Sequence, residues 1–356
     1  MSFKIMPKGV LSDWVERLQR HYRVVGPVEK HGQYVFEELT STDDLCLVYH
    51  PTVLPPKKYI VPPRETLVNY RLDGTHIAAN INVKPTVILG MHTCDIHGVK
   101  LLDKIFDTGF DDQHYQAHRE QTYLVSIECL DTCTDDSFCR DMGTASATDG
   151  QDLHFIDLGE AYAINVVTRK GERLLEGFHH AFDALPSDMN RINRILSEKW
   201  ARFAYRLDFD IYLLPELLEK SYNSDLWNEL GEICLACGMC TQVCPTCYCF
   251  DVTDEADLAL ENGKRVRRWD SCQIHQFAMV AGGHNFRERL AARQRHRFMR
   301  KGKYQMDAIG MVGCVGCGRC ASSCLVNITP INVLNELYAR DKARKEVELM
   351  DREVLA

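Results

Sequence analysis

The sequence has few of the features that place a protein in a membrane or on a nucleic acid. Its 356 residues contain no apolar run of about 18 or more, the length that a membrane-spanning helix requires. The formal net charge is only -8, so overall charge does not favour nucleic acid or an anionic membrane as a partner. The opening residues, MSFKIMPKGVLSDW, lack an apolar core and a small-residue cleavage site. We therefore expect a cytoplasmic protein with no membrane or nucleic-acid partner.

Nucleotide-binding loops are also missing from the sequence. Neither G-x-G-x-x-G between a strand and a helix nor G-x-x-x-x-G-K-[ST] occurs in the chain. The glycines of GCVGCGRC have another explanation in the cysteines beside them. We therefore expect the chain to have no flavin or nicotinamide site of its own.

Cysteine, by contrast, is abundant, with 16 in the chain. A reducing compartment does not sustain structural disulfides, so these cysteines indicate metal ligation or redox chemistry. Half of them fall in two sets with the same spacing, CLACGMCTQVCP at residues 234–245 and CVGCGRCASSC at residues 314–324. The repetition points to two equivalent metal centres.

The spacing of the two sets indicates which metal group they bind. Structural zinc sites usually pair two separated duplets of ligands around one ion. C-x2-C-x2-C-x3-C is instead the spacing of bacterial ferredoxins, in which the fourth cysteine ligates the other cluster. The sequence therefore predicts one [4Fe-4S] cluster on Cys234, Cys237, Cys240 and Cys324, and a second on Cys314, Cys317, Cys320 and Cys244. Leu325 stands where a proline follows Cys244 in the first set, a change that leaves the ligands intact.

Other residues near these cysteines are predicted to act on the clusters. Gly238 and Gly318 follow the second cysteine of each set, where glycine lets backbone N–H groups approach the cluster sulfurs. Residues 264–303 carry twelve Lys or Arg against two acidic residues. We expect arginines of this stretch, Arg293 and Arg295 among them, to balance cluster charge or to dock an acidic partner. A solvated face and a nucleic-acid contact are the alternatives.

Four further cysteines could hold a third [4Fe-4S] cluster, since four thiolates are what such a core requires. They are Cys94, Cys129, Cys133 and Cys139. Reduced buried thiols are the alternative interpretation. His92, Asp95 and His97 bracket Cys94 and are either acid–base residues or contacts around the ligands.

The remaining cysteines have less distinctive surroundings. Cys247, Cys249 and Cys272, with His275, either bind a metal or pack with Trp269 beside the cluster nearest Cys244. Cys46 stands alone in an apolar run and is interpreted as a small core residue.

The expected fold class is α+β. Short apolar runs at residues 45–50, 86–92, 122–129 and 161–167 predict strands, and residues 96–106 and 191–230 predict helices. We expect a mixed α/β N-terminal domain (1–190), a helical connector (191–230), a ferredoxin-like domain with two [4Fe-4S] clusters (231–340) and a C-terminal helix (341–356). A long insertion (245–313) separates the two cluster motifs. PPKKYIVPPR, residues 55–64, is expected to form an extended surface arm.

Several long strings carry a resemblance to a known family. CPTCYCFDV, RRWDSCQ, VAGGHNFR and CVGCGRC, with LPPKKYIVPPRETL (54–67) and GMHTCDIHGVKLLD (90–103), resemble the beta subunit of cytoplasmic NiFe sulfhydrogenases and its iron–sulfur relative in anaerobic sulfite reductase. The resemblance implies an electron-transfer subunit that is not catalytic alone. Its implied partners are a flavoprotein subunit that binds NAD(P)H and a catalytic subunit of the hydrogenase or sulfite reductase type.

One departure from the family concerns the third cluster. The family commonly has Cys-Phe-Cys where this chain has Ser137-Phe138-Cys139, and we expect Cys133 to take the place of the missing thiolate. Two other functions stay open on the sequence: a self-contained reductase with substrate chemistry near Cys94, Cys129 and Cys139, and a nucleic-acid binder with structural clusters.

Overall fold

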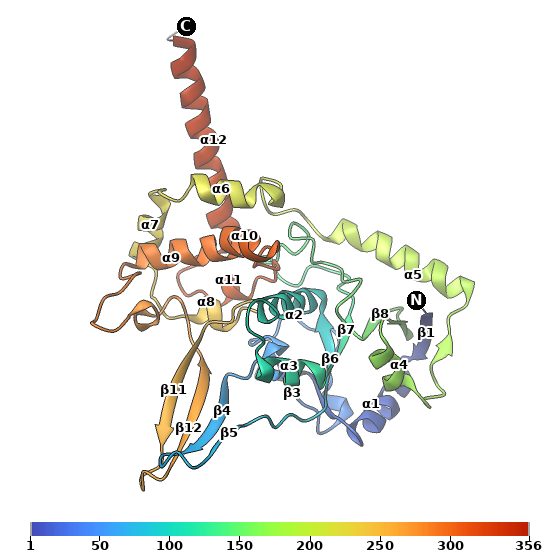
Figure 1. Ribbon diagram of the computed structural model, residues 1–356. Coiled ribbons are helices and arrows are strands. Elements are labelled where there is room, and N and C mark those ends of the chain that lie inside the picture. Colours follow the sequence, from blue (N-terminus) through green and yellow to red (C-terminus); the bar gives the residue numbers. More distant parts are fainter. Residues whose placement is uncertain (1, 355–356) are drawn as a thin grey trace. The chain divides into compact units, whose positions relative to one another are not determined.

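The computed structural model describes residues 2–354 and divides the chain into two compact units (Figure 1). Unit 1 comprises Met1–Thr134, Thr144–Phe203 and Phe250–Trp269, and unit 2 comprises Asp135–Gly143, Ala204–Cys249 and Asp270–Ala356. Each unit is thus assembled from three separate stretches of the chain. The domains expected from the sequence follow one another along the chain, whereas the stretches of these two units alternate along it.

An eight-stranded sheet forms the centre of unit 1. In spatial order its strands are β10 (Phe182–Asp183), β1 (Ser2–Pro7), β9 (Ala161–Val166), β8 (Leu153–Asp157), β7 (Thr122–Ile127), β6 (Thr86–His92), β2 (Arg23–Lys30) and β3 (Gln33–Glu38). Strands β2, β6, β7 and β8 run parallel to one another. Every residue of β6 is buried, as expected of a central parallel strand. The strands predicted at residues 86–92, 122–129 and 161–167 are confirmed.

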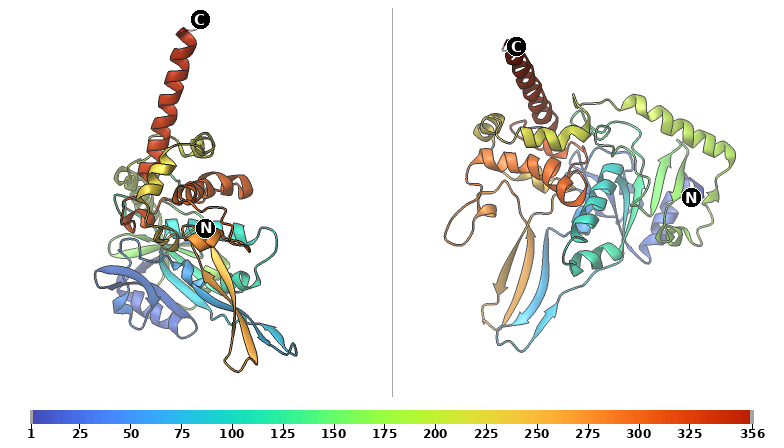
Figure 2. Two further views of the ribbon diagram at one scale, coloured as in Figure 1. Left: turned by 90° about the vertical axis from the view of Figure 1, so that its left-hand side faces the viewer. Right: turned by 45° about the horizontal axis from the view of Figure 1, so that its top comes forward.

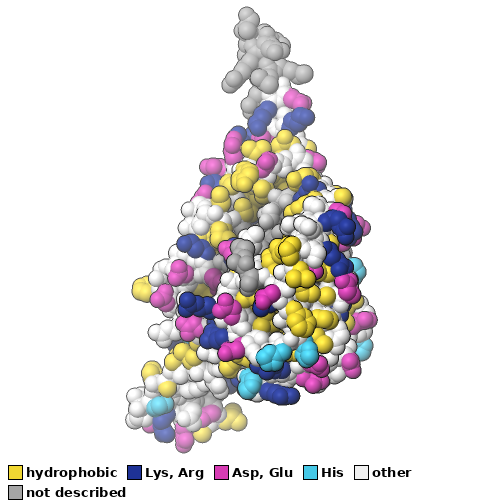
Figure 3. Space-filling view, turned by 90° about the vertical axis from the view of Figure 1, so that its right-hand side faces the viewer, with side chains coloured by type: hydrophobic (Ala, Val, Ile, Leu, Met, Phe, Trp, Pro, Cys, Tyr) yellow, Lys and Arg dark blue, Asp and Glu magenta, His cyan; other side chains and the backbone are white. Residues whose placement is uncertain are grey.

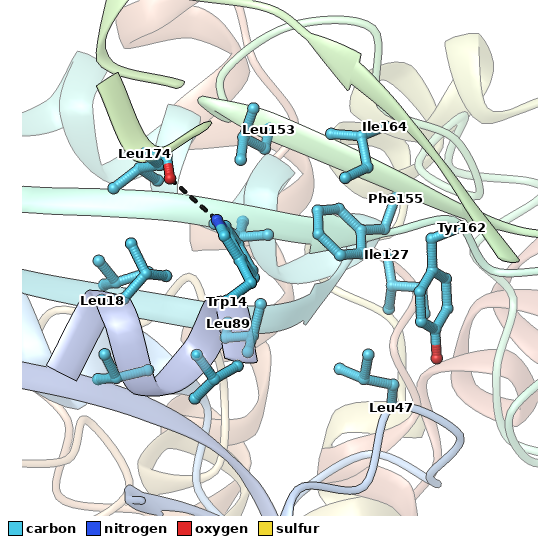
Figure 4. Packing of buried hydrophobic residues seen from close by; sticks show 14 of the residues in the cluster. Trp14, Leu18, Leu47, Leu89, Ile127, Leu153, Phe155, Tyr162, Ile164 and Leu174 are labelled. Atoms are coloured by element: carbon cyan, nitrogen blue, oxygen red, sulfur yellow. Dashed lines mark hydrogen bonds between the residues drawn. The ribbon is translucent and has the colours of Figure 1, made fainter. Parts of the chain in front are cut away.

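Five α-helices accompany this sheet in unit 1. They are α1 (Leu11–Gln19), α2 (Thr93–Phe106), α3 (Gln113–Glu120), α4 (Arg169–Leu175) and α5 (Pro186–Glu198), with 3-10 turns at Lys8–Val10, Thr42–Asp44, Pro56–Tyr59 and Lys199–Arg202. In the main core, Trp14 packs against Phe155 with ring centroids 5.6 Å apart, and its indole Nε1 donates to the Leu174 carbonyl at 2.9 Å (Figure 4). The predicted mixed α and β N-terminal region is confirmed.

The strand predicted at residues 45–50 is wrong, because this segment is irregular. Leu45 and Leu47 lie where a side chain on Gly26 or Gly90 would otherwise stand, so their burial comes from filling gaps over β2 and β6. Cys46 between them is only partly buried and is not in a strand. The run covers glycines with apolar side chains, so it has the composition of a strand, but it does not pair in the sheet as a strand does.

A second sheet of unit 1 has four antiparallel strands in the order β11 (Phe250–Ala256), β12 (Asn262–Trp269), β4 (Arg64–Arg71) and β5 (Ile77–Ala79). These strands lie side by side in every view (Figures 1 and 2). The hairpin β11–β12 belongs to the stretch predicted as an insertion, and its pairing with β4 explains why it belongs to unit 1.

The exposed arm predicted at residues 55–64 is also wrong. The segment forms a 3-10 turn, Ile60 is completely buried, and Lys57 is 3% exposed. The Lys57 ammonium lies 4.4 Å from the centroid of the Trp269 ring, and the Trp269 indole donates to the Val61 carbonyl at 3.0 Å. The prolines therefore shape a packed turn that holds a cation–π contact.

Unit 2 is mainly helical. Its α-helices are α6 (Leu214–Lys220), α7 (Leu226–Ile233), α8 (Met239–Gln242), α9 (Leu290–Met299), α10 (Gln305–Ile309), α11 (Arg319–Ser322) and α12 (Pro330–Val354); a π-helical turn spans Arg300–Tyr304, and 3-10 turns span Ile211–Leu213 and His275–Ala278. The region predicted as a helical connector, 191–230, contains the end of α5, then α6 and part of α7, with 3-10 turns and irregular segments between them. The helix predicted at residues 341–356 is part of the longer α12, and residues 355–356 lie outside the described residues.

The surface gives no sign of a membrane-spanning segment. Within residues 2–354, no helix combines the length and apolar character needed to cross a bilayer. On the face that Figure 3 shows, Lys and Arg side chains are interspersed with Asp and Glu.

Candidate metal centres

Two cavities in unit 2 gather the eight cysteines of the paired sets. Cavity A is lined by Cys234, Cys237, Cys240 and Cys324. Cavity B is lined by Cys244, Cys314, Cys317 and Cys320. Three cysteines of each motif thus meet the fourth cysteine of the other motif. This is the grouping that the ferredoxin spacing predicts.

A left-handed glycine begins the short helix in each motif. Gly238 has φ 77° directly before α8, and Gly318 has φ 76° directly before α11. These are backbone angles that other residues adopt only with strain. The turn lets the chain reverse between the second cysteine, in the loop, and the third, in the helix. Gly318 also lines cavity B, and Gly238 lines cavity A.

Donors from the protein point at the sulfurs of both cavities. In cavity A, the Gln294 side-chain amide donates to Cys234 Sγ at 2.8 Å, and the Ile328 backbone N–H donates to Cys324 Sγ at 3.2 Å. In cavity B, Lys301 Nζ donates to Cys244 Sγ at 3.2 Å. Such bonds stabilise sulfur in its anionic form.

A buried cation, Arg297, and a partly buried one, Lys301, line these cavities. Arg297, 4% exposed, lines both cavities, and Lys301 lines cavity B. Burial pulls the pKa of Lys301 down, but the neighbouring Cys244, Cys247 and Cys314 outweigh burial and raise that pKa well above its ordinary value. For Arg297 burial likewise acts downward, and nearby cysteines, Cys240 and Cys320 first, raise its pKa. Both side chains therefore stay charged inside the protein.

Without a bound metal, the thiols of these cysteines hold their protons more tightly than an ordinary cysteine does. Burial raises the pKa of Cys240, Cys314 and Cys317 to about 11 and that of Cys320 to about 12. A metal must displace these protons, because the thiolate is the ligand. Four convergent soft donors beside fixed positive charge fit a [4Fe-4S] cluster in each cavity.

Arg293 and Arg295, the two arginines proposed as cluster contacts, lie elsewhere. Arg293 donates to the backbone carbonyls of Gln273 and Glu288, both at 2.8 Å, and so ties the loop before α9 to its helix. Arg295 lies 4.1 Å from the Tyr222 ring centroid. Neither residue lines cavity A or cavity B.

The residues that do reach the sulfurs are Gln294, Arg297 and Lys301; the sequence analysis placed Arg297 among the charge-balancing arginines but missed Gln294 and Lys301. Their spacing of three and four residues places them on one face of α9 and the π-helical turn that follows it. This spacing could have identified the face from the sequence, but the many arginines on the same helix made every face look charged.

The four cysteines proposed for a third cluster fall into different surroundings. Cys129 and Cys133 lie with His92 in a compact group whose three ligand atoms are all within 4.8 Å of one another. Cys94 is buried in the first turn of α2, and Cys139 belongs to unit 2. Within the described chain, neither of these two cysteines is a member of that group.

The other residues named with the third cluster make contacts of their own. His97 Nε2 contacts the Ser146 carbonyl at 2.8 Å, and burial lowers the pKa of His97. Asp95 is buried on α2. Ser137 Oγ lies 3.5 Å from the Cys317 carbonyl oxygen, and its neighbour Phe138 lines cavity B. His92, rather than His97, is the histidine that joins cysteine ligands.

Cys247, Cys249 and Cys272 are not among the residues that line cavity B. Cys247 lies near Lys301, and Cys249 and Cys272 lie close enough that their interaction raises the pKa of Cys272. His275 contacts Asn285, with 3.5 Å between the His275 Nδ1 and the amide nitrogen. Trp269 belongs to unit 1, with its indole on Val61.

Comparisons with known proteins agree with this geometry. Residues 233–328, which contain both cysteine sets, match the family model of a 4Fe-4S dicluster domain, which implies two [4Fe-4S] clusters. The chain is 35% identical over 328 residues to the sulfhydrogenase 2 subunit beta of Pyrococcus furiosus, covering 91% of this chain and 95% of that protein. No solved structure matches. With this extent of similarity and the two four-cysteine cavities, the chain belongs to the family of sulfhydrogenase beta subunits, iron–sulfur proteins with a 4Fe-4S dicluster domain.

Proposed function

We propose that this chain is the iron–sulfur subunit of a sulfhydrogenase-like complex. It carries electrons between a flavin-containing, NAD(P)H-binding subunit and a catalytic subunit of the NiFe hydrogenase or sulfite reductase type. The observation that carries the proposal is that cavities A and B each gather four cysteines from both motifs and share Arg297 in their walls. Two redox centres with a common wall are the minimum that a conduit through the chain requires.

The proposed ligands follow the cavities. Cys234, Cys237, Cys240 and Cys324 hold one cluster, and Cys314, Cys317, Cys320 and Cys244 hold the other. A bound [4Fe-4S] cluster accepts and releases single electrons. Apolar side chains around cavity B, Leu214, Leu218 and Phe298 among them, exclude water from its cysteines.

Lys301 supports an anionic occupant of cavity B. A buried ammonium group is costly unless negative charge lies beside it. Its Nζ donates to Cys244 Sγ, to the Thr246 hydroxyl at 2.7 Å and to the Gly313 carbonyl at 2.9 Å. Of these three acceptors only the sulfur can become anionic, and metal ligation is what ionises it.

Cavity A is the side at which electrons enter or leave unit 2. Cys237 is exposed, whereas Cys244 of cavity B is buried. Two apolar side chains that line cavity A are also exposed, Leu235 at 58% and Leu325 at 83%. An exposed ligand within an apolar rim suits contact with a partner subunit.

The finer parts of the functional prediction stay predictions. A third cluster on Cys94, Cys129, Cys133 and Cys139 is one of them, and the absence of a flavin or nicotinamide site is another. A self-contained reductase is the second candidate function, and the compact group of His92, Cys129 and Cys133 is the observation that favours it.

The test uses the full chain purified without oxygen. We expect about eight irons and eight acid-labile sulfides per chain from the two clusters, and about twelve of each if the predicted third cluster also forms. We also expect no reduction of a dye by NADPH or NADH until a flavoprotein subunit is added. Dye reduction by the chain alone would assign the hydride chemistry to this chain and contradict the conduit. An iron content near four would leave one cavity without its cluster and contradict it as well.

A further inference from the structure

The group of His92, Cys129 and Cys133 lies at one edge of the eight-stranded sheet. His92 ends β6, and Cys129 follows the end of the adjacent parallel strand β7 by two residues, with His92 paired to Ile127. The carboxyl ends of parallel strands meet at the same edge, where α/β sheets commonly bind ligands. The sheet register thus brings together residues that are 37 positions apart in the chain, counting from 92 to 129.

The separations of the ligand atoms fit a single ion. His92 Nδ1 and Cys133 Sγ are 3.9 Å apart, and all three ligand atoms are within 4.8 Å of one another. Tetrahedral zinc, with bonds of about 2.3 Å to sulfur and about 2.0 Å to nitrogen, places its ligand atoms about 3.5 to 3.8 Å apart. A [4Fe-4S] core gives each thiolate an iron at its own corner and so spreads the thiolates more widely.

Neighbouring side chains hold the group in place. The Tyr49 ring stacks on the His92 imidazole with centroids 4.0 Å apart, and the Tyr49 hydroxyl donates to the Gly90 carbonyl at 2.7 Å. The Thr93 hydroxyl donates to Cys129 Sγ at 3.5 Å. His50 Nδ1 lies 2.7 Å from the Cys133 carbonyl oxygen. Fixed orientation of the ligands by such partners is typical of built metal sites.

A buried ionic network anchors the loop that carries both cysteines. The Glu128 carboxylate contacts Lys199 Nζ and, at 2.8 Å, His154 Nε2, and all three side chains are at most 6% exposed. Lys199 Nζ also donates to the Cys129 carbonyl at 3.4 Å. A buried charge that lost its partner would be costly, so these ion pairs hold the loop in one conformation.

We propose that His92, Cys129 and Cys133 bind one zinc ion, with water or another small ligand in the fourth position. Two thiolates and one imidazole form a donor set that zinc uses with an open coordination site. Soft sulfur ligands exclude magnesium and calcium. Zinc has no redox chemistry, so this site is not a stop in the electron path, and its existence does not depend on the proposed function.

Metal analysis of the full chain tests the zinc site. We expect about one zinc per chain in addition to the iron of cavities A and B. His92→Ala and Cys133→Ser should each lose the zinc and keep the iron and sulfide of the wild type. Cys139→Ser is the control and should keep both. About twelve irons and no zinc would replace the proposal with a third cluster, and zinc that survives in both ligand variants would place the ion elsewhere.

A second measurement does not depend on variants that fold. Cobalt(II) added to the zinc-depleted wild-type chain should give the charge-transfer absorption of a thiolate-bound ion at about one equivalent. Thr93→Val, which leaves the three ligands in place, should weaken cobalt affinity by about tenfold or more. Absence of the thiolate absorption in the wild type would overturn the proposal. Loss of cluster iron without loss of this signal would contradict the proposed function and leave the zinc site standing.

Discussion

Cavity A and cavity B contain equivalent sets of cysteines, but different groups stabilise the negative charge of the cluster in each. In cavity A the exposed Cys237 faces solvent, and the neutral amide of Gln294 donates to Cys234. In cavity B the buried Cys244 accepts from the ammonium of Lys301. The cysteine spacing therefore determines which cluster binds, whereas one face of α9 and the turn after it determines the charge beside each cluster.

The pairing of cysteines between motifs is the part of the comparison with the largest expected effect. Cys240 and Cys244 are four residues apart in one motif, yet they line different cavities. We expect Cys240→Ser and Cys324→Ser to abolish the same cluster, and Cys244→Ser and Cys314→Ser to abolish the other. Each variant should lose up to about four irons, measured by iron analysis and by EPR of the reduced protein.

The control for this set is Cys46→Ser, which alters a cysteine of unit 1 outside both cavities and should keep all the iron. If Cys244→Ser instead removes the same EPR signal as Cys240→Ser, each motif holds its own cluster and the cross-pairing is wrong.

Lys301 provides the next largest effect. Lys301→Met removes a partly buried positive charge that favours the reduced cluster, so the midpoint potential of the cavity B cluster should fall. We expect a fall of about 60 mV or more, equivalent to about 1.4 kcal/mol for one electron. Redox titration followed by EPR measures it, and the cavity A cluster should move less.

Lys303→Met is the matched control, because it removes the same charge two residues away. Lys303 pairs with Asp307 and Glu219, and its neighbours compensate its charge outside cavity B. An equal fall in both lysine variants would mean that net charge, and not the Lys301 contact, determines the potential.

Gln294 should have a smaller effect in cavity A. Gln294→Leu removes a neutral N–H donor from Cys234 Sγ while keeping the bulk of the side chain. Because the Gln294 donor carries no net charge, its loss should matter less than the loss of Lys301, and we expect the cavity A potential to fall by about 30 mV. A shift in cavity B of the same size would show that the two clusters do not have separate local environments.

The sequence predicted the ligand pattern better than the surroundings of the ligands. Spacing alone grouped the eight cysteines as cavities A and B do, because each cysteine set is a local turn that repeats a known geometry. It did not single out Gln294 or Lys301, since a polar residue on a charged helix looks solvated until the buried face is known. His92, the proposed zinc ligand, was not predicted as one, because sheet register, and not sequence spacing, brings it to Cys129.

The fold shows the same limit. Continuous apolar runs located β6, β7 and β9, whereas the run at residues 45–50 covers glycines and the proline-rich segment at 55–64 packs onto Trp269. Strand β12 of the hairpin pairs with β4, whose residues lie about 190 to 200 positions earlier in the chain. Contacts at such separation leave no local pattern in the sequence.

The smallest expected effect is an absence of pH dependence in cavity B. Burial lowers the pKa of Lys301, but its cysteine neighbours outweigh burial and raise it well above the ordinary value. A raised lysine pKa means that the charge is fully present below the unfolded pKa of about 10.4 and is lost only as pH rises through the folded pKa. The cavity B potential should therefore stay constant between about pH 6 and pH 9.

Lys301→His sharpens this prediction, because histidine has an ordinary pKa near 6.5. In that variant the cavity B potential should fall as pH rises through neutrality and the added charge disappears, with a slope of at most about 59 mV per pH unit. Redox titrations at several pH values compare the two proteins. A similar slope in the wild type would mean that Lys301, or a cysteine beside it, exchanges a proton with each electron, and that the Lys301 ammonium is not a fixed charge.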